Sequence, residues 1–263
     1  MEQQQTWRRE LPNYKQVAPE IEDLPFQARE AINVLRGNIQ LSGANLKVIA
    51  VTSAVANEGK SSIAFRLTKS LAGLKKRTLY LDCDIRNSVT MSRYGMTGQV
   101  QGLTEYLCGA AAMNDIVYRT PDKYMDVILT GAVAPNPSEL VSGKLFTLLL
   151  DEMRKRYDYI IVDTPPINPV IDGTMIAKRC DGTVMVIESG QTDRMQAVRA
   201  KRQLEYAGIK LLGAVLNKVG AAKKGYGYGY GYGYGYGYGY GYGYGEKNQK
   251  RSGKKTDKKE AKD

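Results

Sequence analysis

Residues 48–62 read VIAVTSAVANEGKSS, and this stretch decides the fold. Its opening apolar run, 48–52, predicts a strand buried on both faces, and the pattern of 61–74 predicts a helix soon after it. Between them lies a P-loop in which Ala54 stands at the place of the usual first glycine. A bare Gly-Lys-Ser often arises by chance, but the strand before it and the helix behind it favour a phosphate-binding loop over a plain turn.

The same alternation of strand and helix continues along the chain. Apolar runs rich in Val and Ile predict further buried strands at 78–81, 127–130, 159–162, 183–187 and 212–216. Helical patterns cover 26–41, 138–156 and 195–207. Strands and helices that alternate in this way predict an α/β fold with a doubly wound, mostly parallel sheet and P-loop NTPase architecture.

The composition excludes several kinds of catalyst. The 263 residues contain no histidine, which rules out Ser-His-Asp and Cys-His catalysis and any metal site built on imidazole. The three cysteines are far apart, match no metal-ligand spacing and point to a reducing cytosol. No apolar run approaches the roughly 20 residues of a membrane span, and the first residues are polar, so we expect a cytoplasmic protein.

A low-complexity tail carries much of the positive charge. Residues 225–245 alternate strictly between Gly and Tyr and hold ten of the nineteen tyrosines, and a Lys-rich end follows. From residue 223 onward, ten basic and four acidic residues give +6 of the net +11. Glycine at every second position does not build a packed core, so we expect 223–263 to be disordered. Because the excess charge lies largely in this tail, we expect no nucleic-acid partner.

Acidic residues follow two of the other predicted strands. Asp82 and Asp84 come at the end of 78–81, and Asp163 follows 159–162 in the Walker B pattern, just before Pro165 and Pro166. The carboxyl ends of parallel strands share the edge of the sheet at which open α/β folds bind their ligands. Either of the first two aspartates, taken alone, is as readily explained by a turn or a helix cap. Three acidic residues around one P-loop nevertheless predict a site for ATP and Mg²⁺.

The residue types indicate roles at this site. Lys60 would bind the β- and γ-phosphate oxygens, and the Ser61 hydroxyl with Asp163 would hold Mg²⁺, with Asp82 in its outer shell. We expect Lys60 to lie in a loop that faces solvent and phosphate, so that its replacement would leave the fold intact. The expected ATP-binding segment consists of Asn57, Glu58, Gly59, Lys60, Ser61 and Ser62.

This combination resembles the bacterial tyrosine kinases, or BY-kinases, that accompany capsule and exopolysaccharide synthesis. The P-loop, the Asp-x-Asp-x-Arg motif that ends at Arg86 and the Asp-x-Pro-Pro motif at Asp163 match that family in order and spacing. Residues 102–107, 135–140 and 215–218 match further segments. The resemblance covers roughly residues 24–220, and a C-terminal tyrosine cluster is itself a feature of the family.

Three positions distinguish the chain from its relatives. The helix before the first strand carries Glu30, Asn33 and Arg36 where the family has Glu-x-x-Arg-x-x-Arg, a motif associated with ring assembly. The resemblance therefore assigns Glu30 and Arg36 to oligomerisation, although the middle arginine is missing. Asn57 replaces a common proline, which we expect to be tolerated because backbone N–H groups bind the phosphates. Val55 replaces an additional lysine of the related Min and Par partition ATPases.

The resemblance implies an N-terminal extension (1–23), a P-loop tyrosine-kinase domain (24–222) and a tail (223–263). It implies transfer of phosphate from ATP to tyrosine, with Asp84 accepting or orienting the hydroxyl proton and Asn217 reading the adenine. The division of roles between Asp82 and Asp84 stays open. The expected phosphoacceptors are the ten tyrosines of the tail, namely Tyr226, Tyr228, Tyr230, Tyr232, Tyr234, Tyr236, Tyr238, Tyr240, Tyr242 and Tyr244.

The resemblance also implies partners. A membrane adaptor of the polysaccharide copolymerase type would activate the chain and recruit it to the inner face of the cell membrane. A tyrosine phosphatase would reverse the modification, and the kinase would form a homo-oligomer, for which a ring is one arrangement. Its activity would regulate the synthesis and export of capsule or exopolysaccharide.

Two alternatives belong to other functional classes. Gly-Tyr repeats also occur as adhesive low-complexity segments that associate through aromatic contacts. The whole chain could instead be a P-loop ATPase that acts as a scaffold or partitioning switch without tyrosine chemistry. Detection of phosphotyrosine after incubation with Mg-ATP separates these classes from a kinase.

Overall fold

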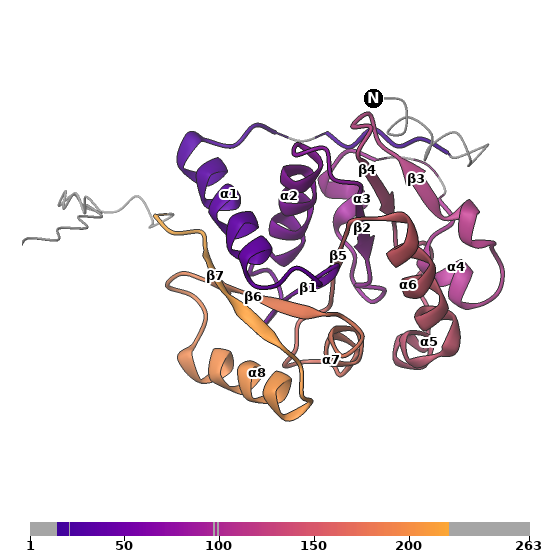
Figure 1. The fold of residues 1–263 in the computed structure, drawn as a ribbon. Helices are drawn as coiled ribbons and strands as arrows, with labels where there is room; N and C mark the ends of the chain where they lie inside the picture. Colours follow the sequence, from indigo (N-terminus) through magenta and orange to yellow (C-terminus); the bar gives the residue numbers. More distant parts are fainter. Residues whose placement is uncertain (1–14, 21, 97, 99, 221–263) are drawn as a thin grey trace, which may run out of the picture. The chain divides into compact units, whose positions relative to one another are not determined.

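The computed structural model describes residues 15–20, 22–96, 98 and 100–220. The predicted disorder of 223–263, and with it the ten tail tyrosines, lies outside the described residues. Within the described part, seven strands form one sheet with helices on both faces (Figure 1). The strands are β1 (Val48–Ser53), β2 (Thr78–Asp82), β3 (Val117–Arg119), β4 (Met125–Ile128), β5 (Tyr159–Asp163), β6 (Gly182–Glu188) and β7 (Leu211–Asn217).

The sheet has the predicted doubly wound, mostly parallel topology. Its strand order is β3-β4-β2-β5-β1-β6-β7, and each pair is parallel except β3 with β4. The antiparallel strand β3 was not predicted, because three residues carry too short a pattern to detect. β4 follows β3 after a short connection and pairs with it in the antiparallel sense, as two strands of a hairpin do.

The predicted strand at 127–130 was placed two residues too late. β4 covers Met125–Ile128, although the apolar run continues through Leu129. The carbonyls of Leu129 and Thr130 accept hydrogen bonds from the N–H groups of Leu103 and Thr104, at 2.8 and 2.9 Å. Leu129 and Thr130 therefore accept hydrogen bonds from the first residues of a helix and do not extend the strand.

The helices flank the sheet in two layers. The prediction of one helix over 138–156 was wrong, because Gly143 has extended backbone angles and separates two helices. Short helices were also missed, since four to six residues are too few to show a helical period of apolar residues.

The helices of the described residues are α1 (Phe26–Leu41), α2 (Lys60–Ala72), α3 (Thr90–Arg93), α4 (Leu103–Leu107), α5 (Pro137–Ser142), α6 (Lys144–Arg156), α7 (Asp172–Ala177) and α8 (Arg194–Tyr206), with a 3-10 turn η2 (Met113–Asp115).

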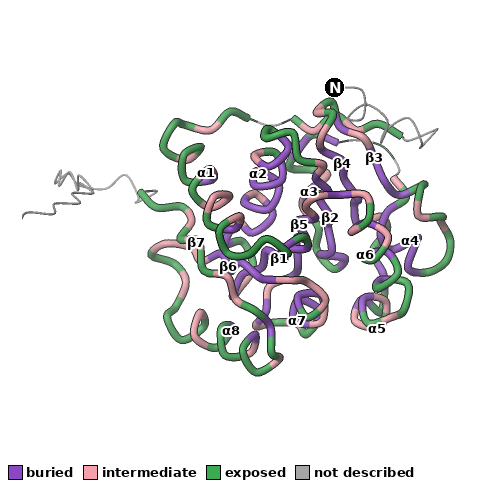
Figure 2. The backbone as a smooth tube through the Cα atoms, in the orientation of Figure 1, coloured by how far each residue is buried: buried purple, intermediate pink, exposed green. Residues whose placement is uncertain are grey.

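Side chains of the central strands alternate between two cores. On β1, Ile49 and Val51 pack with α1 and α2 on one face. Val48 packs on the opposite face with α4 to α7, and Ala50 packs there with α7 and α8. Figure 2 shows the central strands buried, whereas α1 and α8 expose much of their outer surface. Strands buried on both faces explain why the sequence shows continuous apolar runs.

The registers of the central strands bring the predicted site together. β1 lies between β5 and β6, and β5 lies between β1 and β2. Asp163 of β5 is paired with Asp82 of β2 on one side and with Val51 of β1 on the other. The P-loop leaves β1 at this same edge, so the acidic strand ends flank it as the sequence predicts.

The residues before α1 also contact the body of the protein. The N–H of Val17 donates to the carbonyl of Arg119 at 3.0 Å, and the N–H of Glu20 donates to the carbonyl of Tyr94 at 2.9 Å. The last part of the predicted N-terminal extension therefore lies against the edge strand β3 and the turn after α3.

Candidate active site

The P-loop joins the end of β1 to the first turn of α2. Asn57 and Gly59 have left-handed backbone conformations, with φ of 67° and 94°. Asparagine tolerates this region better than most residues, and glycine adopts it freely. A Cβ atom at Gly59 would lie 2.2 Å from Nδ2 of Asn217, so the neighbouring side chain also requires glycine there. The open N-terminus of α2 then follows, which is the backbone arrangement that binds phosphate.

The carboxylate of Glu58 stabilises the P-loop by accepting hydrogen bonds. Its side chain is buried, with 1% of the residue exposed. One carboxylate oxygen accepts a hydrogen bond from the N–H of Val55 at 2.8 Å. The other accepts from the hydroxyl of Thr192 and, at 3.4 Å, from the N–H of Glu188. The carboxylate therefore links the P-loop to the segment between β6 and α8, which the sequence did not indicate.

Two residues at the end of β7 hold the outside of the loop. The amide nitrogen of Asn217 donates to the carbonyl of Glu58 at 2.9 Å. The Lys218 ammonium donates to the carbonyl of Asn57 at 2.8 Å and pairs with Glu188, also at 2.8 Å. Asn217 thus supports the loop directly, and its proposed contact with adenine stays a prediction. Lys218 was not predicted as a site residue, because the sequence around the end of one strand does not show which loop that end will contact.

Lys60 lies among carboxylates. Its ammonium is 2.8 Å from Oδ2 of Asp84 and 3.8 Å from Oδ1 of Asp163. Only 8% of Lys60 is exposed, and it is the first residue of α2. The expectation that Lys60 lies in a loop facing solvent was therefore wrong. Because the acidic strand ends surround it, the ammonium neutralises a buried acidic cluster as well as facing the P-loop.

Hydrogen bonds fix the orientation of the two strand-end carboxylates. Asp82 accepts from the Ser88 hydroxyl at 2.6 Å and from the N–H of Asp84 at 3.1 Å. The Tyr80 hydroxyl donates to Oδ2 of Asp163 at 3.0 Å. Oδ1 of Asp163 is buried and has no hydrogen-bond partner. This oxygen is directed to the region of Lys60, where a ligand would complete its contacts.

Burial and mutual charge set the protonation of this cluster. Burial raises the pKa of Asp163 to about 7; Lys60 opposes the rise, and Asp82 adds to it. Burial also raises the pKa of Asp82, against the hydrogen bond from Ser88. For Lys60, burial acts to lower the pKa, but Asp163 and Asp84 outweigh it and the pKa is raised. The lysine therefore stays an ammonium while Asp163 titrates near neutral pH.

Arg86 connects the site to the opposite helical layer. Its guanidinium pairs with Asp172, the first residue of α7, and donates to the hydroxyl of Ser138 in α5 at 3.3 Å. Ser138 also donates to Asp172. The hydrogen bond with Asp172 raises the pKa of Arg86. Asp172 is 1% exposed, so this contact holds the turn after β2 against a buried anion.

A pocket of about 390 Å³ opens at this edge of the sheet. Asn57, Gly59, Lys60, Ser61 and Asp84 all line it, which brings most of the predicted phosphate-binding segment together. Arg93, at the end of α3, adds a cation that the sequence did not single out. The remaining lining comes mainly from the turn after β2 and the proline-rich turn after β5, with Ala56, Arg86, Asn87, Val89, Pro165, Pro166, Pro169, Val170 and Lys218.

The donor set fits Mg²⁺ that binds together with a nucleotide. In the part of the chain that the structure describes, no group of three or more acidic or thiol side chains is placed to hold a metal ion by itself. Mg²⁺ commonly takes only one or two carboxylates and completes its shell with water and substrate phosphates. The Ser61 hydroxyl and Oδ1 of Asp163, which lies 3.8 Å from the Lys60 ammonium, are donors of this kind.

Seven predicted site residues in the described part of the chain do not line this pocket, namely Glu30, Arg36, Glu58, Ser62, Asp82, Asp163 and Asn217. Ser62 is half-buried on α2 and lines a separate groove of about 620 Å³ between α1 and β7. Glu30 accepts a hydrogen bond from Asn33 at 2.9 Å, and Arg36 donates to Ser70 of α2 at 2.8 Å. The pair assigned to oligomerisation therefore lies on α1, away from the phosphate-binding loop.

The fold and the loop define a P-loop nucleotide-binding protein, and the AAA domain family matches residues 46–193. The tyrosine-protein kinase CpsD of Streptococcus agalactiae is 41% identical over 201 residues, which cover 76% of this chain and 88% of that protein. The chain therefore belongs to the family of bacterial tyrosine-protein kinases.

Solved structures agree with this assignment. The kinase domain of the Escherichia coli tyrosine kinase ETK has a TM-score of 0.71 at 25% identity, covering 85% of this chain and 98% of that domain. The chimerical protein CapA2B2 has a TM-score of 0.69 at 27% identity, covering 81% of this chain and 97% of that one. None of the helices in the described part of the chain has the length and apolar character needed to cross a membrane.

Proposed function

We propose that the chain transfers the terminal phosphate of ATP to the tyrosines of its own C-terminal cluster, Tyr226 to Tyr244, and thereby regulates synthesis and export of capsule or exopolysaccharide. The observation that carries the proposal is the position of Lys60, held between Asp84 and Asp163 beside the P-loop. A buried ammonium among acidic strand ends provides the charges that phosphoryl transfer requires.

Each residue of the cluster has a part in this proposal. Asn57 to Ser62 bind the phosphates through the loop and the start of α2, and Lys60 stabilises charge on the β- and γ-phosphate oxygens. Ser61 and Asp163 hold Mg²⁺, with Asp82 beside them at the next strand end. When bound, Mg²⁺ supplies positive charge to the transferring phosphate.

Asp84 orients the tyrosine hydroxyl or accepts its proton. A tyrosine has a pKa of about 10, so a carboxylate at the reacting oxygen is needed near pH 7. Asp84 lines the pocket and shares the Lys60 ammonium at 2.8 Å. Phosphate oxygens compete for that ammonium, and a nucleotide would therefore free Asp84 for the acceptor.

The proposal extends to partners. A membrane adaptor recruits the kinase from the cytoplasm to the inner face of the membrane and activates it, a tyrosine phosphatase reverses the modification, and Glu30 and Arg36 take part in a homo-oligomer. The similarity to a chimerical CapA2B2 protein is consistent with a kinase that works with a separate polypeptide.

Phosphotyrosine formed on the purified chain with Mg-ATP tests the function. A variant with all ten tail tyrosines changed to phenylalanine should lose most of the phosphotyrosine while still binding ATP. Tyr206→Phe is the matched control, because Tyr206 is 97% exposed but is the last residue of helix α8, outside the tyrosine cluster. ATP hydrolysis without phosphotyrosine would instead indicate an ATPase switch, and an unchanged signal in the ten-residue variant would place the acceptors elsewhere.

A further inference from the structure

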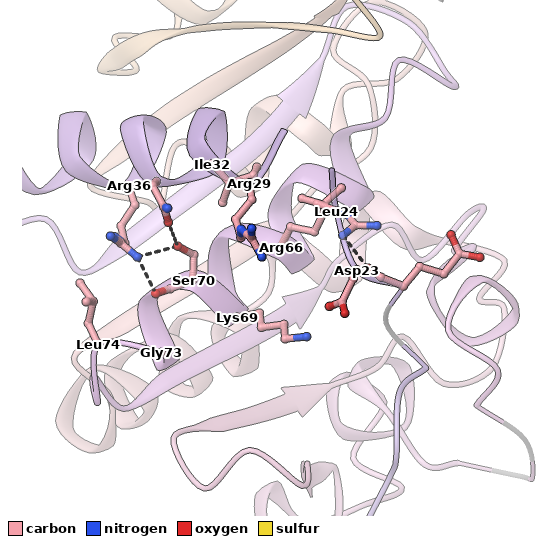
Figure 3. Close-up of a pocket in the computed structure, with 12 residues that line it drawn as sticks. Asp23, Leu24, Arg29, Ile32, Arg36, Arg66, Lys69, Ser70, Gly73 and Leu74 are labelled. Atoms are coloured by element: carbon pink, nitrogen blue, oxygen red, sulfur yellow. Dashed lines mark hydrogen bonds between the residues drawn. The ribbon is translucent and has the colours of Figure 1, made fainter. Parts of the chain in front are cut away.

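A second groove lies between α1 and α2, apart from the nucleotide pocket (Figure 3). It encloses about 330 Å³, at the low end of the roughly 300–1,000 Å³ of small-ligand pockets. It shares no lining residue with the pocket at the P-loop. The two sites are nevertheless joined by α2, which begins at Lys60 and contributes Arg66, Lys69 and Ser70 to the groove.

Four cationic side chains line this groove, which are Arg29, Arg36, Arg66 and Lys69. Within the described ranges, none of them has a carboxylate within 4.0 Å. Arg66 donates to the carbonyl of Glu22 at 3.1 Å, and Arg36 to the carbonyl and hydroxyl of Ser70 at 3.1 and 2.8 Å. Neutral oxygens thus hold two guanidinium groups in place and leave their charges uncompensated. The Nε atom of Arg36 is also buried without a hydrogen-bond partner.

The groove is also partly apolar. Leu24, Ile32 and Leu74 line it between the cations, and Leu74 is 44% exposed. Glu22 and Asp23 are the acidic members of the lining. Figure 3 shows Asp23 beside Leu24 at one end of the groove, with Arg36, Ser70 and Leu74 at the other. The four cations against two carboxylates leave the lining with an excess of positive charge, and Arg66 reaches the end of the groove that Glu22 and Asp23 line.

We propose that this groove binds phosphotyrosine, supplied by the tyrosine cluster of a second copy of the chain. The inference rests on the proposed function, which would create this group. A phosphate of about −1.5 to −2 charges matches guanidinium groups that can bind it in a bidentate manner. The aromatic ring matches the apolar wall, and arginine clusters beside an apolar surface are a general means of recognising phosphorylated motifs.

Chemistry favours phosphotyrosine over the simpler anions. Phosphoserine and inorganic phosphate would meet the cations but leave the wall formed by Leu24, Ile32 and Leu74 uncovered. Unmodified tyrosine would cover the wall but leave the cations without a counter-charge. Because Arg66 and Lys69 lie about 1.7 and 2.5 turns along α2 from Lys60, a bound phosphotyrosine would contact the same helix that follows the P-loop.

Binding of a labelled Gly-Tyr peptide with one central phosphotyrosine, measured by fluorescence anisotropy at fixed ionic strength, tests the proposal. The full chain is treated with phosphatase beforehand, and the phosphatase is removed. Arg29→Ala/Lys69→Ala should weaken binding by about tenfold or more, since two charge-assisted contacts are lost. Arg199→Ala/Arg202→Ala on α8 is the control, because it removes the same charge from exposed positions on the opposite face of the sheet.

The unphosphorylated peptide, a phosphoserine peptide and inorganic phosphate should each bind at least tenfold more weakly than the phosphotyrosine peptide. No binding of the phosphotyrosine peptide, equal binding of the other three probes, or equal weakening by the α8 variant would overturn the assignment. A circular dichroism spectrum like that of the wild type shows that the variants are folded. Because the assay uses no ATP, failure of the kinase proposal would leave this binding measurable, and failure of binding would leave autophosphorylation unaffected.

Discussion

Charged side chains are paired at the acidic edge of the sheet but not in the cationic groove between α1 and α2. At the sheet edge, the Lys60 ammonium lies 2.8 Å from Asp84 within a buried acidic cluster. In the groove, Arg36 and Arg66 donate to neutral oxygens, and the described residues place no carboxylate at ion-pair distance from them. The protein therefore balances charge internally where we propose chemistry and leaves charge uncompensated where we propose binding.

The difference follows from where each region lies in the fold. Strand ends at the centre of the sheet are shielded from water, so charges there need a partner within the chain. The α1–α2 groove is open to solvent, which hydrates arginine and lysine at little cost. Replacing one charged residue should thus destabilise the fold strongly at the sheet edge and only slightly in the groove.

The largest effect is expected at Lys60. Lys60→Met should reduce phosphotyrosine formation on the order of 10²–10³-fold or more, because a positive charge at the transferring phosphate is lost. It should also lower the melting temperature, since Asp84 and Asp163 lose their common cation. Phosphotyrosine and thermal unfolding, measured on the same preparation, check both effects.

A double variant separates the two roles of Lys60. Lys60→Met/Asp84→Asn should recover part of the lost stability, because one buried negative charge is removed, but should recover none of the activity. Lys76→Met, at an exposed position after α2, is a control for loss of a lysine and should behave as the wild type. Full activity of Lys60→Met would contradict the assigned role.

The sequence allowed the sheet edge to be predicted because its parts are local patterns. The P-loop, Asp82 and Asp163 each directly follow an apolar run, and parallel topology is enough to bring such strand ends together. The boundary of α1 was predicted to the residue, and those of α2 and α8 within one or two. Errors fell where no period is visible, as at the three-residue strand β3 and the break at Gly143.

The supports of the site could not be predicted from the sequence. Glu58 contacts Thr192, and Lys218 contacts the carbonyl of Asn57, only because the segment after β6 and the end of β7 both fold over the P-loop. The burial of Lys60 depends likewise on three strand ends at once. The groove between α1 and α2 has no motif at all, since its cations come from two helices whose packing sets their spacing.

A smaller but measurable effect concerns pH and Asp163. Its pKa is raised to about 7 by burial, from a model-compound value of 3.8, so the folded state binds more protons than the unfolded state between these values. Stability of the nucleotide-free protein in EDTA should therefore fall as pH rises, by about 2–3 kcal/mol between pH 5 and 8. Urea unfolding at several pH values measures this slope.

Asp163→Asn should remove most of that slope, because the neutral amide does not titrate. Asp158→Asn is the matched control: Asp158 is partly buried, and the hydrogen bonds from Arg77 lower its pKa, so its contribution to stability is lost only at acidic pH. Its variant should keep the wild-type slope between pH 5 and 8. Equal slopes for the wild type and Asp163→Asn would show that Asp163 is not the group responsible.

The smallest expected effect concerns Asn217, and it distinguishes support of the P-loop from contact with the base. Its amide donates to the carbonyl of Glu58 at 2.9 Å, whereas the family resemblance assigns it to the adenine. Loss of one hydrogen bond to the loop in Asn217→Ala should raise the KM for ATP by about threefold to tenfold. If Asn217 acts only through the loop, the KM for GTP should rise by the same factor. A fall in the preference for ATP over GTP would instead show that the amide reads the base, because only then does its loss distinguish the two nucleotides. Lys218→Ala provides the comparison: its ammonium contacts the carbonyl of Asn57 at 2.8 Å, so its loss should weaken both nucleotides equally.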